Sequence, residues 1–339
     1  MNIVRKSIFA AAVMTSAVGA TLPPRAPRTV TLPAIENNLS LLTYNVEGLP
    51  WPVASGRPAD LTAIADRLRD LRTRGQAPHV VVLQEAFTTD AKAIGRAAGY
   101  RYVVNGPSAD LTARLAGSPA DARLAAGAHW WSGETMGKML GSGLQLMSDY
   151  PIVSVRRMVF PASDCAGYDC LANKGAMLVR IAVPGLATPV DIVTTHLNSR
   201  TASGVDKARS DEAYDRQVDL MTRFVEQTRD PRNPLIVAGD FNVGKTAARR
   251  ATLLGNIAAR WSVAGGVRDA LGQAAEDGLP LPGDALASRK RAKDWQFFAP
   301  GHAARLELTG IAVPFGKEPA GDMLSDHVGY IAYFRENAR

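Results

Sequence analysis

Two short polar motifs, each joined to an apolar run, constrain this chain more than any other feature. Gly239–Asn242 follows the apolar segment 234–238, and Ser325–His327 directly precedes the apolar segment 328–334. Apolar runs of this length predict buried β-strands, so each motif should lie at a strand end. Because side chains alternate along a strand, Asp240 and Asn242 should share one face while Phe241 occupies the other.

The first twenty residues have the pattern of a secretory signal. Arg5 and Lys6 form a basic start, 7–18 is a short apolar run, and Val18–Ala20 offers small residues for cleavage. The run is too short to cross a bilayer, and a buried N-terminal helix is the alternative. We therefore predict a signal peptide over 1–20 and a secreted or periplasmic protein.

The rest of the chain is long enough for one large domain. Residues 21–37 contain four prolines and predict an extended linker. The composition, 46% hydrophobic and 21% charged, is that of a globular chain, so we expect one folded domain over 38–336. Cleavage would lower the formal net charge from +7 to +5, because two basic residues leave. A modest positive charge suits anionic partners such as phosphate esters without singling out nucleic acid.

Apolar periodicity predicts strands interspersed with two amphipathic helices. Strand 39–45, helix 60–74 and strand 80–83 form a crossover unit. Segments 177–183 and 190–195 predict a hairpin, whereas 105–143 predicts an irregular or partly helical insertion. The other expected elements are a helix over 209–229 and strands over 144–147, 152–160, 234–238, 294–298 and 328–334. This order predicts a mixed two-sheet core with helices outside.

The two cysteines, Cys165 and Cys170, lie close together around Gly167. A close pair in an exported protein predicts a disulfide, and Gly167 allows so small a loop to close. Zinc is disfavoured, because no further cysteine or nearby histidine completes a set of four ligands.

Polar side chains at the ends of the first two strands offer ligands for a hard cation. Glu85 closes the strand 80–83, and Asn45 ends the strand 39–45. A carboxylate suits Mg²⁺, which takes few protein oxygens, and an amide beside it can ligate the ion or hold a ligand in place. The structural alternatives are a solvated strand end for Glu85 and an Asx turn for Asn45.

Two later strand ends carry groups suited to phosphate chemistry. The imidazole of His196 can donate to a phosphate oxygen, with a structural histidine as the alternative. Asp240 and Asn242 together can orient a water and a phosphate oxygen, with a strand-ending turn as the alternative.

An acidic residue inside a strand and an Asp-His pair complete the set. Asp294 interrupts an otherwise apolar strand and needs a partner, for which an imidazole is suited because an aspartate fixes its tautomer. Asp326 and His327 offer a metal or water contact followed by an imidazole.

Taken together, these motifs resemble those of the endonuclease/exonuclease/phosphatase superfamily. The matching residues are Tyr44–Asn45, Gln84–Glu85, Asn173–Gly175, Thr195–Leu197, Gly239–Asn242, Asp294 and Ser325–His327. Stretches 148–152, 159–160 and 165–175 further resemble bacterial sphingomyelinase C. The resemblance covers 39–334 and implies a catalytic domain with a four-layer α/β sandwich fold. In that fold helices flank two mixed, mostly antiparallel β-sheets, as in deoxyribonuclease I-like proteins.

The same resemblance assigns roles to individual residues. It implies Mg²⁺ dependence, with Mn²⁺ or Co²⁺ as substitutes, and the metal ligands Glu85, Asn45 and Asp326. The implied catalytic cluster is His196, Asp240, Asn242, Asp294 and His327, and the implied substrate contacts are Asn173, Lys174 and Asn198. Whether His327 or Asp240 takes the proton from water stays open.

The chain departs from the sphingomyelinases in several places. Asn198 stands where they usually carry Gln, and 308–324 has only Phe315 in an apolar tip where haemolytic members have an aromatic hairpin. Trp130 and Trp131 could make a membrane contact instead, although such a pair is more often packed in a core or cap. The basic run 289–293 could meet an anionic substrate, but such a run is more often a solvated face.

These features favour a secreted, monomeric, Mg²⁺-dependent phosphodiesterase that hydrolyses a phospholipid head group. Sphingomyelin is the first candidate substrate, and the reaction would be in-line attack of an activated water. Its partner would be a phosphate ester, with peripheral membrane contact. One alternative is an extracellular nuclease or a phosphomonoesterase on the same scaffold; a nuclease predicts salt-sensitive binding and basic or aromatic loops at the cleft. A second alternative is a non-catalytic binding protein on a decayed enzyme scaffold, which the filled acid, base and metal positions disfavour.

Overall fold

The computed structural model describes residues 31–35, 38–113, 119–261, 265–317 and 323–337. The predicted signal peptide over 1–20 and most of the predicted linker over 21–37 lie outside these residues. No helix in the described segments is both long enough and apolar enough to span a bilayer.

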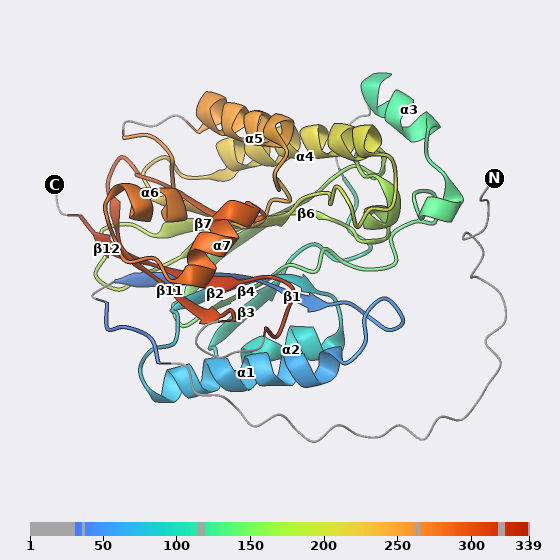
Figure 1. Cartoon of the computed structure of the whole chain (residues 1–339). Helices are drawn as coiled ribbons and strands as arrows, with labels where there is room; N and C mark the ends of the chain where they lie inside the picture. Colours follow the sequence, from blue (N-terminus) through green and yellow to red (C-terminus); the bar gives the residue numbers. More distant parts are fainter. Residues whose placement is uncertain (1–30, 36–37, 114–118, 262–264, 318–322, 338–339) are drawn as a thin grey trace, which may run out of the picture.

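Two mixed β-sheets of six strands each lie at the centre of the molecule (Figure 1). The first contains, in order, β11 (Leu306–Phe315), β12 (Gly329–Glu336), β1 (Leu39–Gly48), β2 (Val80–Ala86), β4 (Gln145–Ser148) and β3 (Tyr102–Asn105). The second contains β5 (Ile152–Val159), β6 (Gly175–Ile181), β7 (Val190–His196), β8 (Leu235–Asp240), β10 (Asp294–Ala299) and β9 (Arg268–Asp269). Neighbouring strands are antiparallel except for two parallel pairs, β1 with β2 and β7 with β8.

Helices cover the outer face of each sheet (Figure 1). The first sheet is covered by α1 (Arg57–Thr73) and α2 (Thr89–Ala97), and the second by α4 (Lys207–Thr228) and α5 (Ala247–Arg260). Shorter helices are α3 (Pro119–Ala126), which contacts α4, and α6 (Ala270–Glu276) and α7 (Gly283–Arg291), which contact β10 and β11. The four layers confirm the predicted α/β sandwich.

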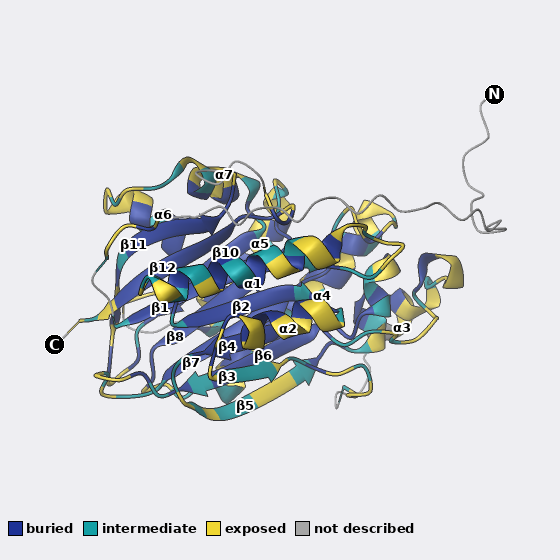
Figure 2. Cartoon of the chain, turned by 90° about the horizontal axis from the view of Figure 1, so that it is seen from below, coloured by how far each residue is buried: buried dark blue, intermediate teal, exposed yellow. Residues whose placement is uncertain are grey.

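The central strands are apolar on both faces because each face packs against another layer. On β2, Val82 joins the core between the sheets, whereas Val81 packs under α1 and α2. On β8, Ile236 joins the core between the sheets, whereas Val237 packs under α4 and α5. Figure 2 shows these inner strands as buried and the edge strands β3 and β5 as more exposed. Burial on both faces explains the continuous apolar runs in the sequence.

The predicted strands, crossover unit and hairpin are present, but other elements differ from the sequence analysis. Helix α1 begins at Arg57, before its apolar stripe, because Pro58 fits the first helical turn. The helices α2 and α5 were not predicted. Strand β11 occupies much of 308–324, the region in which Phe315 was expected to form an apolar tip. Phe315 is buried there and stacks on Tyr44 with ring centroids 4.7 Å apart, so its prediction as a tip residue was wrong.

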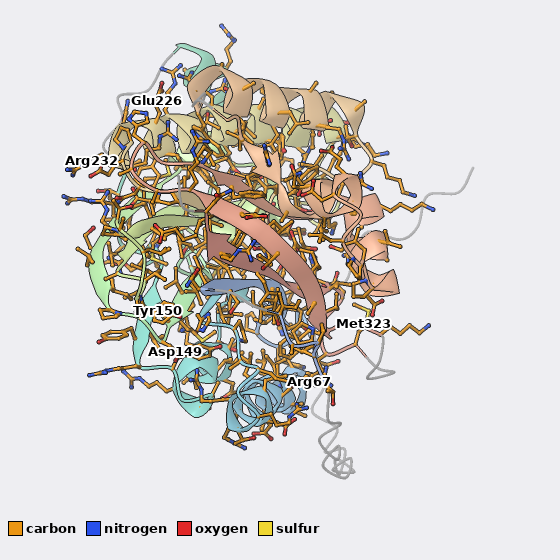
Figure 3. All side chains as sticks on the ribbon, turned by 90° about the vertical axis from the view of Figure 1, so that its left-hand side faces the viewer. Arg67, Asp149, Tyr150, Glu226, Arg232 and Met323 are labelled. Atoms are coloured by element: carbon orange, nitrogen blue, oxygen red, sulfur yellow. A yellow bond between two sulfur atoms is a disulfide. The ribbon has the colours of Figure 1, made fainter. Side chains whose placement is uncertain are left out.

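Side-chain contacts tie the layers together at the end where β1 and β2 begin (Figure 3). Asp149 pairs with Arg72 of α1 at 2.9 Å. Tyr150 stacks on His79 with ring centroids 4.9 Å apart, and its hydroxyl donates to the carbonyl oxygen of Asn38 at 3.1 Å. These contacts fix the start of both strands and leave their carboxyl ends for the polar residues at the opposite end.

Gly239 is needed where β8 runs beside β7. A Cβ atom at this position would lie 2.2 Å from the carbonyl oxygen of Thr195. We predict that Gly239→Ala lowers the free energy of unfolding by about 1–3 kcal/mol, because the parallel strands must separate. Gly255→Ala in α5 is the matched control, since no atom lies within 4 Å of its added Cβ. Urea unfolding should show an unchanged or higher stability for Gly255→Ala; equal stability of both variants would contradict the close-approach argument.

Candidate active site

Strand pairing brings the polar motifs together at one end of the sandwich. In the first sheet, Asn45 lies beside Gln84, the residue before Glu85. In the second sheet, His196 and Asp294 lie on either side of Asp240, in the parallel partner β7 and the antiparallel partner β10. Parallel strands end at the same edge of a sheet, so residues far apart in the sequence meet there.

An amide bridges two carboxylates from different sheets. The Nδ2 atom of Asn45 donates to Glu85 Oε1 at 2.8 Å and to Asp240 Oδ2 at 3.1 Å. Its Oδ1 atom accepts the backbone N–H of Glu47 at 3.1 Å. The amide therefore positions the two carboxylates. Burial raises the pKa of Glu85 to about 7, and Glu85 has a left-handed φ of 58°, a costly conformation for a residue other than glycine.

His196 faces the same two carboxylates. Its Nε2 atom lies 3.7 Å from Asp240 Oδ2 and 4.0 Å from Glu85 Oε1. Its Nδ1 atom is buried without a hydrogen-bond partner, which favours the tautomer that carries its proton on Nε2. Burial lowers the pKa of His196 to about 3, so the imidazole is neutral near pH 7. Its Nε2–H group can therefore donate a hydrogen bond to an anionic group while the imidazole itself is uncharged.

One imidazole joins two buried aspartates. His327 Nδ1 lies 2.8 Å and 2.9 Å from the two carboxylate oxygens of Asp294, and His327 Nε2 lies 3.6 Å from Asp240 Oδ2. His327 is the imidazole partner that the sequence predicted for Asp294, and Asp294 holds it with Nε2 toward Asp240. Burial lowers the pKa of His327, but attraction to Asp294 and Asp240 outweighs burial and raises that pKa to about 9.

A cavity of about 580 Å³ opens above these groups. Glu85, His196, Asp240, Asn242 and His327 line it. The rest of the wall is largely apolar and contains Leu49, Pro50, Val53, Phe87, Leu140, Leu171 and Ala172. The structure thus places ionisable groups and an extended apolar wall in one cavity.

The segment between the cysteines forms part of the wall. Cys165 and Cys170 form the predicted disulfide. Asp169, between them, lines the cavity and pairs with Lys174 at 2.8 Å. Lys174 is buried and also donates to the carbonyl oxygen of Leu197 at 3.2 Å. This ion pair therefore places a cation and an acid on the cavity wall.

Two residues predicted to contact substrate have other partners. The Nδ2 atom of Asn173 donates to the carbonyl oxygens of Ser108 and Leu111, each at 2.8 Å. The side chain of Asn198 accepts from the backbone N–H of Ala166 at 3.0 Å and is fully buried. Neither residue lines the cavity, so the structure supports a substrate contact only for Lys174.

Asp326 lies at the mouth of the cavity rather than with Glu85. Its side chain is 59% exposed and pairs with Arg291 at 3.2 Å. Its Oδ1 atom also lies 3.8 Å from His327 Nε2, and its role as a metal ligand stays a prediction. The basic run has a mixed outcome: Arg289 is exposed as a solvated residue, whereas Lys293 lines the cavity.

The group Glu85, His196 and Asp240 fits a divalent cation. Ligand atoms of these three residues lie within 4.8 Å of one another. Two carboxylates approach a single amide, and burial penalises the charge on Glu85. A hard cation would offset that penalty, and oxygen donors suit Mg²⁺. Glu85 is the most accessible carboxylate of the group, with 18% of its side chain exposed, whereas Asp240 has 2%.

Two buried arginines that sequence motifs did not reveal hold the site in place. Arg57 donates to the carbonyl oxygens of Val46 at 2.7 Å and Leu324 at 2.8 Å, which ties the end of β1 to the segment before His327. Arg249 donates to the carbonyl oxygens of Asn198 at 2.8 Å and Asn242 at 3.0 Å. Neither arginine belongs to a motif, so only the three-dimensional contacts identify them.

A family model described as the Endonuclease/Exonuclease/phosphatase family matches residues 42–327. The match spans most of the chain, and the chain belongs to this family of phosphoric ester hydrolases. The resemblance drawn from the motifs is confirmed, and the protein is an enzyme by class.

Several solved structures share the fold. Sphingomyelinase C from Streptomyces griseocarneus is 23% identical, with 87% of this chain and 98% of that chain covered and a TM-score of 0.56. A beta toxin mutant from Staphylococcus aureus with bound magnesium ions is 17% identical, with 87% and 99% covered and a TM-score of 0.55. D. rerio TDP2 complexed with a single-strand DNA product is 17% identical, with 88% and 98% covered and a TM-score of 0.56. No curated protein sequence matches the chain.

Arg249 offers a test of how the site is held. Its side chain is fully buried and its Nε atom donates to Asp211 at 2.6 Å. We predict that Arg249→Lys costs about 3 kcal/mol of unfolding free energy, because lysine cannot reach all these acceptors and leaves buried groups unpaired. Thermal and urea unfolding measure the loss. The exposed neighbour Arg250 is the control, and Arg250→Lys should change stability by about 0.5 kcal/mol or less; similar losses in both variants would contradict the role of Arg249.

Proposed function

We propose that this chain is an exported Mg²⁺-dependent phosphodiesterase that hydrolyses the head group of a phospholipid. The observation that carries the proposal is the cavity, in which the ionisable residues Glu85, His196, Asp240 and His327 adjoin the apolar wall. A phosphodiester with an apolar portion matches both surfaces, because its phosphate meets the polar floor and its hydrocarbon covers the wall. The disulfide supports export, since such bonds persist in oxidising compartments.

Glu85 is the proposed principal ligand for Mg²⁺, with Asp240 beside it and Asn45 holding the two carboxylates. When bound, the ion would neutralise charge on the phosphate oxygens. The proposal rests on the grouping of these ligand atoms and on the buried charge of Glu85.

The chain's own residues supply the other parts of an in-line displacement. His327 exchanges a proton at Nε2, and Asp294 stabilises the imidazolium. Asp240 accepts the backbone N–H of Asn242 at 2.9 Å, which leaves its Oδ2 atom directed at both histidines. His196 is neutral and donates from Nε2 to a phosphate oxygen. A water that lies beside this pair and contacts both Asp240 Oδ2 and His327 Nε2 would be oriented by both groups.

A substrate panel tests the proposal. With Mg²⁺, the full chain should hydrolyse sphingomyelin or phosphatidylcholine in mixed micelles faster than bis-p-nitrophenyl phosphate, and all activity should disappear in EDTA. The apolar wall contributes binding only for lipid substrates, which is why the lipids should be preferred. Plasmid DNA as the best substrate would favour the nuclease alternative, to which the fold shared with TDP2 also points.

The contact of His327 with Asp294 predicts that the two residues act as a unit. His327→Ala should lower turnover by about 10²–10⁴-fold, the usual effect of losing an acid–base group. Asp294→Asn should also lower turnover, because an amide cannot stabilise the imidazolium. The double variant should cost little more than His327→Ala alone. Fully additive losses in kcat would show that Asp294 acts independently, as a structural strand residue.

A further inference from the structure

Two segments beside the cavity mouth expose large apolar side chains. Trp51 is 82% exposed and Val53 is 71% exposed in the loop after β1. In the segment 129–139, Trp130 is 68% exposed, Trp131 is 62% exposed and Met139 is 63% exposed. Large apolar side chains gathered at one place on a soluble protein mark a surface that binds something. We call 49–53 and 129–139 the mouth loops.

Both mouth loops adjoin the same cavity. Val53 lines it directly, as do Tyr168 and Leu171 on the other side. The hydroxyl of Tyr168 donates to the carbonyl oxygen of Trp131 at 3.4 Å, and the backbone N–H of Met139 donates to Leu171 at 2.8 Å. Figure 1 shows the loop after β1 and the segment after α3 at the same end of the molecule. The segments that carry the exposed side chains therefore adjoin residues of the cavity wall.

The turn that carries the tryptophans is held by a buried carboxylate. The side chain of Glu134 is 1% exposed and accepts from four donors. They are the backbone N–H of His129 at 2.9 Å, Ser132 Oγ at 2.8 Å, the backbone N–H of Gly167 at 2.9 Å and Arg209 Nε at 2.6 Å. Bonds to a charged acceptor are among the stronger ones in proteins.

The tryptophan rings are also ordered against each other rather than packed into the protein. Trp131 stacks on His129 with ring centroids 4.2 Å apart, and Trp130 meets Trp131 edge to face at 6.1 Å. Glu134 and this stacking fix the backbone of the turn, yet both indoles face solvent. A rigid turn that presents aromatic side chains reduces the entropy lost on binding.

We propose that the mouth loops dock the protein on the surface of a phospholipid bilayer. The proposal rests on the proposed function, because it places a lipid substrate at the mouth of its cavity. Tryptophan partitions into the interface of a bilayer, and the aliphatic side chains of Val53 and Met139 can enter its apolar region. A docked bilayer would meet the apolar wall directly, so a lipid could enter the cavity without exposing its hydrocarbon to water.

The chemistry of the mouth favours a bilayer over single-stranded nucleic acid. The exposed tryptophans have rings on which bases can stack, but the aliphatic side chains of Val53 and Met139 beside them do not. The cavity lining holds the acidic residues Glu47, Asp169 and Asp326 beside the two lysines Lys174 and Lys293, so it is not the basic groove that would follow a polyanion. Lys138, within one mouth loop, is held by the carbonyl oxygen of Cys170 at 2.9 Å.

Binding to vesicles in EDTA tests docking without turnover. The probe is large unilamellar vesicles of phosphatidylcholine, and the readout is co-sedimentation of the full chain. The double variant Trp130→Ser/Trp131→Ser and the single variant Trp51→Ser should each weaken partitioning by about tenfold or more, because each removes interfacial indole contacts. Val153→Ser is the control, since Val153 is 56% exposed on the edge strand β5, and it should bind like the parent.

Three further readouts separate docking from catalysis. Circular dichroism verifies folding, and hydrolysis of water-soluble bis-p-nitrophenyl phosphate should be unchanged in the tryptophan variants. Vesicle binding by a parent chain that hydrolyses no lipid would contradict the proposed function but not docking. Docking is overturned if the parent does not bind vesicles or if the tryptophan variants bind like the parent. It is also overturned if those variants lose binding only to a single-stranded oligonucleotide.

Discussion

The buried carboxylate of Asp240 is the group on which the arrangement of the site depends. It accepts from Asn45 Nδ2 at 3.1 Å and from the backbone N–H of Asn242 at 2.9 Å, and it faces the Nε2 atoms of His196 and His327. Burial alone would raise the pKa of Asp240, but the histidines, Lys293 and the Asn242 N–H hold it well below its usual range. A buried charge of this kind persists only with compensating partners, so its neighbours are fixed in type as well as in position.

Those neighbours come from both sheets, which explains why the site needs the whole sandwich. Asn45 and Glu85 come from the first sheet, and Asp240, His196 and Asp294 come from the second. His327 joins them from the segment before β12, where Ser325 donates to the carbonyl oxygen of Asn45 at 2.7 Å. The apolar core between the sheets therefore sets the distance between Glu85 in the first sheet and Asp240 and Asp294 in the second.

The apolar wall of the cavity bears on which substrate the site accepts. The shared fold is compatible with lipid and DNA substrates, since the sphingomyelinase C and TDP2 structures are about equally similar to this chain in TM-score, both 0.56. In our proposal the loops select the substrate, because they form the wall and mouth of the cavity while the strand ends form its floor. Selectivity of this kind arises from loops on a common scaffold.

Sequence patterns identified the polar residues that line the cavity better than the buried residues that hold them in place. Phe241 packs in the core while Asp240 and Asn242 line the cavity, as predicted, but β8 ends at Asp240 and a turn closed by the bond from the Asn242 N–H to Asp240 places Asn242. The isolated charge of Asp294 correctly indicated a buried partner. Arg249 and Glu134 escaped notice, because their partners lie far away in the sequence and no local pattern marks a buried ion pair. Asn198 stands where the sphingomyelinases usually carry Gln, and its side-chain oxygen accepts from the backbone N–H of Ala166 instead of facing the cavity.

Calorimetric titration of Mg²⁺ into the full chain without substrate tests the central claim most directly. The account predicts binding of one ion at the Glu85–Asp240 group and loss of that binding in Glu85→Gln, which keeps the shape but removes the charge that a hard cation requires. Glu47→Gln is the control, because Glu47 lines the same cavity without belonging to the group, and it should bind Mg²⁺ like the parent. Unchanged Mg²⁺ binding in Glu85→Gln would contradict the account.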